Sequence, residues 1–174
     1  MTKKRWISLL VENEIGVLAR ISGLFSGKSY NLNSLTVGTT EDTTISRMTI
    51  SLTSDDQTFE QIKKQLNRSV EVIKVIDFTD TAIHMKELMF IRVNNCSNED
   101  MATLTYMRDV FSAKMIDYNT TTVLFECVQA ENQNNDFIRL IQSTFPNRIK
   151  IVRGGNVAIE GISISSGKKM LHQK

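Results

Sequence analysis

The segment RWISLLVENEIGVLARISGLFSG, residues 5–27, contains a strand, a sharp corner and a helix in direct succession. Apolar side chains alternate over Arg5–Val11, which predicts a strand with at least one buried face. After Val17, further apolar residues follow one, four, seven and eight positions on, which is typical of an amphipathic helix. Gly27 is suited to the end of that helix. The polar turn around Gly16 therefore joins a strand directly to a helix.

The rest of the first half predicts two more strands, a helix and a fourth strand. We expect these elements at residues 30–37, 46–52, 59–66 and 70–78, respectively. The apolar phase slips within the first of these strands, which indicates a β-bulge at Asn33–Ser34. Ser54 or Asp55 can cap the helix. The order of elements is therefore βαββαβ.

The second half repeats this order. Strands are expected at 88–93, 115–118, 123–128 and 149–152, and helices at 101–111 and 137–145. Pro146 cannot continue the last helix. The chain is therefore predicted to be an α+β protein made of tandem ferredoxin-like βαββαβ sandwiches. We expect a first domain over residues 1–79, a linker over 80–86 and a second domain over 87–174.

Composition excludes several classes of protein. Of 174 residues, 41% are hydrophobic and 23% are charged, as in an ordinary globular chain. The net charge of +2 is too balanced for a broad phosphate-binding surface, and residues 46–52 have no aromatic side chain for base stacking, so no nucleic-acid partner is expected. The apolar runs are too short to span a membrane and no targeting segment precedes the first strand. We expect a cytoplasmic protein with no membrane partner.

The residue types that carry catalysis are scarce. His84 and His172 have no partner at metal-ligand spacing, and Cys96 and Cys127 form no C-x-x-C pair and are expected to be buried. Two acidic pairs, Asp55–Asp56 and Glu99–Asp100, stand at predicted helix starts, where carboxylates complement the helix dipole. Neither a catalytic site nor a metal site is expected.

The corner between the first strand and the first helix is the best candidate ligand site. The first amides of a helix can bind a carboxylate, and Gly16 lets a ligand approach the backbone. Asn13, and Asn31 from a second protomer, offer amide groups that can bind an ammonium group. The apolar wall would come from Ile15, Val17, Leu18 and Leu32. The alternative is that Asn13 caps the helix, Gly16 makes the turn and the apolar residues fill the core. Pattern alone leaves both interpretations open.

Residues 9–20, LLVENEIGVLAR, resemble the opening of the regulatory small subunit of acetolactate synthase. Further segments resemble that family in its order: GLFS at 23–26, YNLNSLTV at 30–37, SRMTI at 46–50, QLN at 65–67 and ELMFIRV at 87–93. The likeness spans most of residues 3–93. In the second half it rests on Ile116–Asp117 and, loosely, on Arg153–Gly155.

The resemblance implies an N-terminal ACT domain, in which two protomers pair their sheets side by side and hold a regulatory amino acid, commonly valine, at their interface. It implies effector contacts by Asn13, Gly16 and Asn31, with Ile15, Val17, Leu18 and Leu32 lining the site. The second half is then the family's C-terminal domain, which helps engage the large catalytic subunit.

The same resemblance implies the biochemical role. The chain would activate the catalytic subunit of acetolactate synthase and confer feedback inhibition by valine in branched-chain amino acid biosynthesis. That partner is expected to use thiamine diphosphate, Mg²⁺ and FAD, whereas this chain is expected to bind no cofactor. Ile15 replaces the family's usual Pro or small residue, Ser29 its usual Gly, and Asn33 its usual acidic residue. The alternative is a stand-alone amino-acid sensor or interaction module without a catalytic partner.

Overall fold

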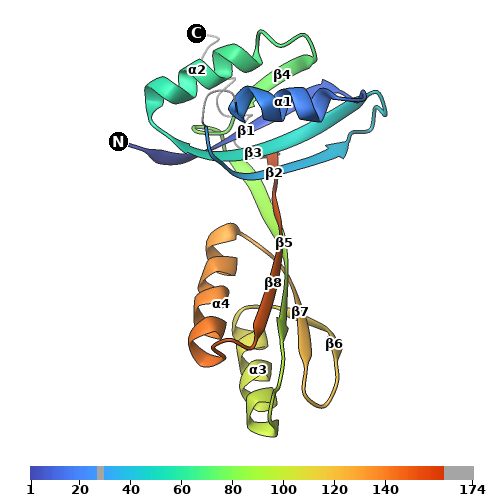
Figure 1. The fold of residues 1–174 in the computed structure, drawn as a ribbon, viewed down its shortest axis with the longest axis vertical. Helices are drawn as coiled ribbons and strands as arrows, with labels where there is room; N and C mark the ends of the chain where they lie inside the picture. The colour runs from blue at the N-terminus through green and yellow to red at the C-terminus, as the bar shows by residue number, and fades with distance from the viewer. Residues whose placement is uncertain (27–29, 163–174) are drawn as a thin grey trace. The chain divides into compact units, whose positions relative to one another are not determined.

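The computed structural model describes residues 1–26 and 30–162 (Figure 1). The elements are β1 Lys3–Glu12, α1 Val17–Ser26, β2 Leu32–Thr39, β3 Ile45–Ser54, α2 Asp56–Leu66, β4 Val72–Asp77, β5 Ile83–Val93, α3 Asn98–Val110, β6 Lys114–Tyr118, β7 Val123–Gln129, α4 Glu131–Thr144 and β8 Ile149–Glu160. They form two four-stranded sheets, with strand orders β2-β3-β1-β4 and β6-β7-β5-β8. The predicted tandem of βαββαβ sandwiches is confirmed.

The described chain divides into two compact units. The first unit holds residues 1–84 together with 156–162, and the second unit holds residues 85–155. In the first unit α1 and α2 cover one face of the sheet (Figure 1). Alternate residues of β1, Ile7, Leu9 and Val11, face these helices and are fully buried. They pack on apolar side chains of both helices, Val17, Ile21, Phe25, Phe59, Ile62 and Leu66. Burial of each large side chain contributes about 1.5–3 kcal/mol.

Two local predictions for the first unit are confirmed. The pairing of β2 with β3 shifts register between Leu32 and Ser34, where the bulge was expected. Asp55 is the cap of α2, because its carboxylate accepts a hydrogen bond from the Thr58 amide at 2.8 Å. The bulge lets Leu32 and Leu35 both pack against the core although they are three residues apart.

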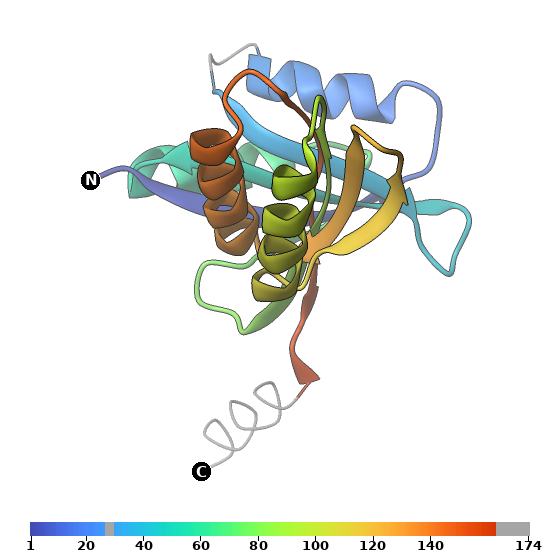
Figure 2. The ribbon, with the colours of Figure 1, turned by 90° about the horizontal axis from the view of Figure 1, so that it is seen from below.

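In the second unit α3 and α4 lie side by side against the sheet (Figures 1 and 2). The core contains Met89, Ile91 and Phe125 from the strands and Leu104 and Phe137 from the helices. Cys96 and Cys127 are free and buried, as expected. Burial raises the pKa of the Cys127 thiol to about 11.

A polar cluster joins β5, β8 and α4 of the second unit. Glu87 on β5 is 3% exposed, and its two carboxylate oxygens accept hydrogen bonds from Arg153 Nε at 2.8 Å and Nη2 at 2.7 Å. Asn134 on α4 donates to Glu87 Oε2 at 3.0 Å, and Arg153 also donates to Asn135 at 2.8 Å. The cluster therefore ties α4 to β5 and β8.

Two segments differ from the expected boundaries. β8 was expected at 149–152 but continues to Glu160, and its last five residues belong to the first unit. β5 begins at Ile83, inside the segment expected as a linker, so that His84 is an exposed strand residue. His172 lies outside the described residues.

Candidate functional site

The candidate site begins where β1 ends. Asn13 is exposed, and its amide donates to the Thr44 carbonyl at 2.7 Å. Its side-chain Nδ2 donates to the Thr43 carbonyl at 2.8 Å, and its Oδ1 accepts from Ser46 Oγ at 3.0 Å. Asn13 is thus held by the β2–β3 connection and by β3. These bonds attach the side chain of Asn13 to the β2–β3 connection and to β3 rather than to the first turn of α1.

Gly16 supplies the sharp corner that precedes α1. Its φ of +88° lies in the left-handed region, which L side chains rarely adopt. A Cβ at this position would meet Arg20 Nη2 at 3.9 Å, an ordinary contact, so that conformation rather than space favours glycine. The backbone amide of Arg20 donates the first hydrogen bond of the helix, to the Gly16 carbonyl at 3.0 Å. The amides of Leu18 and Ala19 precede that bond and have no partner within the helix.

The electrostatics of this helix start differ from those of the other helices. Among the four helices of the described chain, only α1 has no acidic residue in its first turn. The start of α3 carries a full capping box, in which Ser97 accepts from the Asp100 amide and Asp100 accepts from the Ser97 amide. A helix start with no carboxylate of its own is suited to the carboxylate of a ligand.

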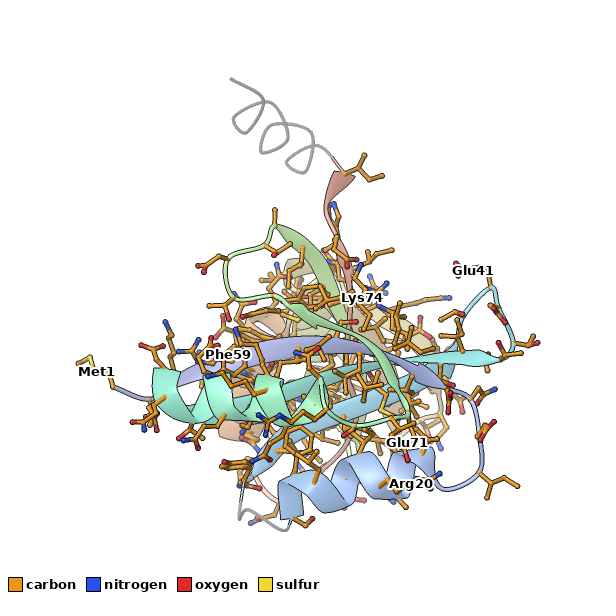
Figure 3. The ribbon with its side chains drawn as sticks, turned by 90° about the horizontal axis from the view of Figure 1, so that it is seen from above. Met1, Arg20, Glu41, Phe59, Glu71 and Lys74 are labelled. Atoms are coloured by element: carbon orange, nitrogen blue, oxygen red, sulfur yellow. The ribbon has the colours of Figure 1, made fainter. Side chains whose placement is uncertain are left out.

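A second set of contacts holds the loop from the side of β4. Arg20 Nε lies 2.9 Å from Glu71 Oε1, and the Glu12 amide donates to the Glu71 carbonyl at 3.0 Å. Figure 3 shows Arg20 and Glu71 close together, with Arg20 on α1. Glu71 therefore fixes both ends of the loop. Arg20 is not among the predicted site residues, although it falls within the LLVENEIGVLAR segment.

The apolar residues of the loop divide into two kinds. Ile15 is 100% exposed and Leu18 is 43% exposed, so that both can meet a ligand or a second protein. Val17 is 2% exposed and belongs to the core of the first unit. The side chain of Val17 therefore lies in the core rather than at the surface of the loop.

Asn31 and Leu32 lie at the other end of α1. This helix has ten residues, so about 15 Å of helix separates them from Gly16. Asn31 is exposed, and Leu32 at the start of β2 is partly buried against the core. One protomer alone does not bring the two groups of predicted residues together. β2 is an edge strand of its sheet, so a second copy can approach it.

The acidic side chains and the helices of residues 1–26 and 30–162 bear on other kinds of site. No group of three or more His, Cys, Asp and Glu side chains is placed to hold a metal ion in that part of the chain. None of its helices has the length and apolar character needed to cross a membrane. Asp56, Glu99 and Asp100 lie in first helical turns, as predicted. Hydrogen bonds from Arg148 and Ser97 lower the pKa of Asp100.

Comparisons with known proteins agree with this arrangement. The family model "AHAS small subunit-like ACT domain" matches residues 7–74, and the family model "Small subunit of acetolactate synthase" matches residues 86–162. The acetolactate synthase small subunit of Buchnera aphidicola subsp. Schizaphis graminum is 34% identical over 158 residues, which cover 90% of this chain and 98% of that protein. The chain belongs to the acetolactate synthase small-subunit family.

Two further relatives extend the likeness over nearly the whole chain. The acetolactate synthase small subunit of Aquifex aeolicus is 38% identical over 158 residues, which cover 90% of this chain and 81% of that protein. The crystal structure of the acetolactate synthase small subunit from Thermotoga maritima superposes with a TM-score of 0.81 at 30% identity, and covers 92% of this chain and 99% of that one. The first unit therefore contains the ACT domain, and the second contains most of the family's C-terminal domain.

Proposed function

We propose that this chain is the regulatory subunit of an acetolactate synthase. It activates a large, thiamine-diphosphate-dependent catalytic subunit and makes that enzyme sensitive to feedback inhibition by valine. Membership of the small-subunit family supports the partnership. The observation that carries the effector site is the start of α1, where a glycine corner leads into a first turn without acidic residues.

The chemistry of the loop suits a small zwitterion. The amides of Leu18 and Ala19 would bind the carboxylate of valine, at the positive end of the helix dipole. Asn13 Oδ1 accepts one hydrogen bond, from Ser46, and a second lone pair is available for the ammonium group. The exposed side chains of Ile15 and Leu18 would contact the isopropyl group.

Asn31 and Leu32 would complete the site from a second copy of the chain. Two protomers that pair along their β2 edges would bring the end of α1 in one copy near the start of α1 in the other. The proposed assembly is therefore a homodimer of ACT domains with effector sites at the interface. Valine would bind one arrangement of the paired sheets more tightly than the other, and a coupling of about 1–3 kcal/mol would be ordinary.

The experiment mixes the full chain with the catalytic subunit of acetolactate synthase from the same organism and measures acetolactate formation with and without valine. We expect the chain to raise the activity and valine to lower it. Asn13→Ala or Gly16→Asp should raise the valine concentration for half-inhibition at least tenfold, while activation stays within twofold. The Asp carboxylate would repel the carboxylate of valine and compete with it for the helix amides.

Two control variants separate the site from general effects on folding. Gly16→Ala carries at least the backbone strain of Gly16→Asp but none of its charge, so it should lose less affinity for valine. Asn67→Ala removes an exposed asparagine at the end of α2 and should leave inhibition unchanged. Full valine sensitivity in Asn13→Ala and Gly16→Asp would refute the site. A chain that neither co-purifies with the catalytic subunit nor activates it would instead support a stand-alone sensor.

A further inference from the structure

The last five residues of β8, Asn156–Glu160, form what we call the C-terminal strap. They belong to the first unit, where they meet the face of the sheet that α1 and α2 leave open (Figure 1). Thr36 Oγ1 on β2 donates to the Asn156 carbonyl at 2.7 Å. Asn156 and Ala158 are buried, whereas Val157 and Ile159 are more than half exposed. Alternate residues of the strap thus face the sheet and the solvent.

The open face of the sheet has small polar side chains at its centre, which leave room for this segment. Its central positions carry small hydroxyl side chains, Ser8, Thr49 and Ser51, and all three are buried. On the same strands the alternate positions, which face the helices, are large and apolar. Thr36, Thr49, Val157 and Ala158 border one cavity of about 300 Å³, so the strap does not fill the whole face.

Arg47 on β3 joins the strap to this face. Its Nε donates to Ser8 Oγ at 2.8 Å, and its Nη2 donates to Glu160 Oε2 at 2.9 Å. Burial disfavours the charged form of Glu160, but hydrogen bonds from its own backbone and from Arg47, with the charges of Arg47 and Lys74, outweigh that effect. The pKa of Glu160 therefore lies below its ordinary value of 4.5, and the ion pair is complete at neutral pH.

The residue before Arg47 holds the candidate effector loop. Ser46 Oγ donates to Asn13 Oδ1, and successive side chains of a strand point to opposite faces. Adjacent residues of β3 therefore hold Asn13 on one side and Glu160 on the other. The same strand β8 that ends in the strap starts at Ile149, in the second unit.

We infer that Arg47 is a positioning residue that transmits the state of the effector loop to β8, and through β8 to the C-terminal domain. The inference rests on the proposed function, since it assumes that an amino acid binds beside Asn13. A ligand that displaces Asn13 and Ser46 displaces the neighbouring Arg47 and the ion pair with Glu160. The strap then has different stabilities in the free and bound states, which is the condition for coupling between two sites.

The test compares wild type with Arg47→Ala and with Glu160→Gln, which keeps the shape of the side chain and removes its charge. Valine binding to the full chain is measured by calorimetry, and inhibition is measured in the reconstituted synthase. We expect both variants to bind valine within about threefold of the wild-type affinity, yet to lose at least four-fifths of the maximal inhibition. The exposed Arg68→Ala in the same unit should change neither quantity.

Two further measurements distinguish coupling from simple damage to the fold. The double variant Arg47→Glu with Glu160→Arg reverses the pair and should restore at least half of the lost inhibition. In wild type, valine should change the hydrogen exchange of Val157–Glu160, and in Arg47→Ala it should not. Inhibition of Arg47→Ala equal to wild type would overturn the inference while leaving the effector site intact. A wild-type chain that binds neither valine, leucine nor isoleucine would overturn the proposed effector function, and this inference with it.

Discussion

Removal of Arg153 should destabilise the second unit far more than an exposed ion pair would. In the Arg153→Ala variant the Glu87 carboxylate keeps its burial, at 3% exposed, but loses both charge-assisted hydrogen bonds. Only Asn134 Nδ2 would still donate to it. Loss of one partner of a buried pair costs about 3–5 kcal/mol, because an uncompensated charge remains. Since the Arg153 side chain is 34% exposed and water can enter, we expect a value near the lower end of that range.

The companion variants separate charge from shape. Glu87→Gln leaves the partly exposed guanidinium able to reach water and should cost about 1–2 kcal/mol. The double variant Glu87→Gln with Arg153→Met leaves no buried charge, so it should be more stable than Arg153→Ala alone. If each side chain contributed independently to stability, the double variant would be less stable than Arg153→Ala, so the expected order tests the coupling between the two residues.

The assay is urea unfolding of the full chain, followed by far-UV circular dichroism and by hydrogen exchange of the β5 amides. Trp6, the single tryptophan, lies in the first unit, so its fluorescence reports that unit in the same samples. We expect Arg153→Ala to lower the free energy of exchange of the β5 amides by more than it lowers the unfolding free energy reported by Trp6 fluorescence. A loss below about 1 kcal/mol in Arg153→Ala, or a loss equal to that of Glu87→Gln, would refute the account of Glu87 as a buried charge that depends on Arg153.

Three further predictions concern single groups. The raised pKa of Cys127, about 11, and the burial of Cys96 should make both thiols unreactive toward iodoacetamide at pH 8 until the chain is unfolded, as mass spectrometry can show. The pKa of Asp100 is lower in the folded chain than its ordinary value of 3.8, so the ionised carboxylate stabilises the fold above pH 3.8 and this stability is lost as the pH falls through the folded pKa. Asp100→Asn should therefore show a smaller loss of melting temperature between pH 5 and pH 3 than wild type. Ala19→Asp should abolish valine inhibition without loss of thermal stability, because a carboxylate in the first turn favours the helix but competes with the ligand. The uncharged Ala19→Asn should lose less inhibition.

Local patterns were sufficient to predict most of the fold. The βαββαβ order follows from short periodic runs separated by polar turns, and the bulge at Asn33–Ser34 follows from one slip in apolar phase. The Asp55 cap of α2 also needs only neighbouring residues. Each of these features depends on chain segments that are close in sequence, where side-chain periodicity and hydrogen bonding within a few residues decide the conformation.

Long-range polar contacts could not be predicted in the same way. Glu87, Asn134 and Arg153 are polar residues at positions that periodicity assigns to no site, yet they are bonded across separations of 47 and 66 residues. The extension of β8 to Glu160 is similar, since its last residues are bonded to Thr36 and Arg47, which are more than 100 residues away in the sequence. Pattern reasoning finds which side chains are buried but not which distant polar group satisfies them.

The two units share a topology but not the chemistry of their first helix. In both, the chain leaves a central strand, turns and enters a helix. The start of α3 is closed by Ser97 and Asp100, which bond each other's amides. At α1 the equivalent corner is Gly16, which has no side chain and leaves the next amides without a carboxylate partner from the first turn. A repeated fold therefore does not imply a repeated site. The difference between a first turn with a capping box and a first turn without acidic residues is the physical reason to expect the effector at the first unit. It is also why a single added carboxylate at Ala19 is a decisive test.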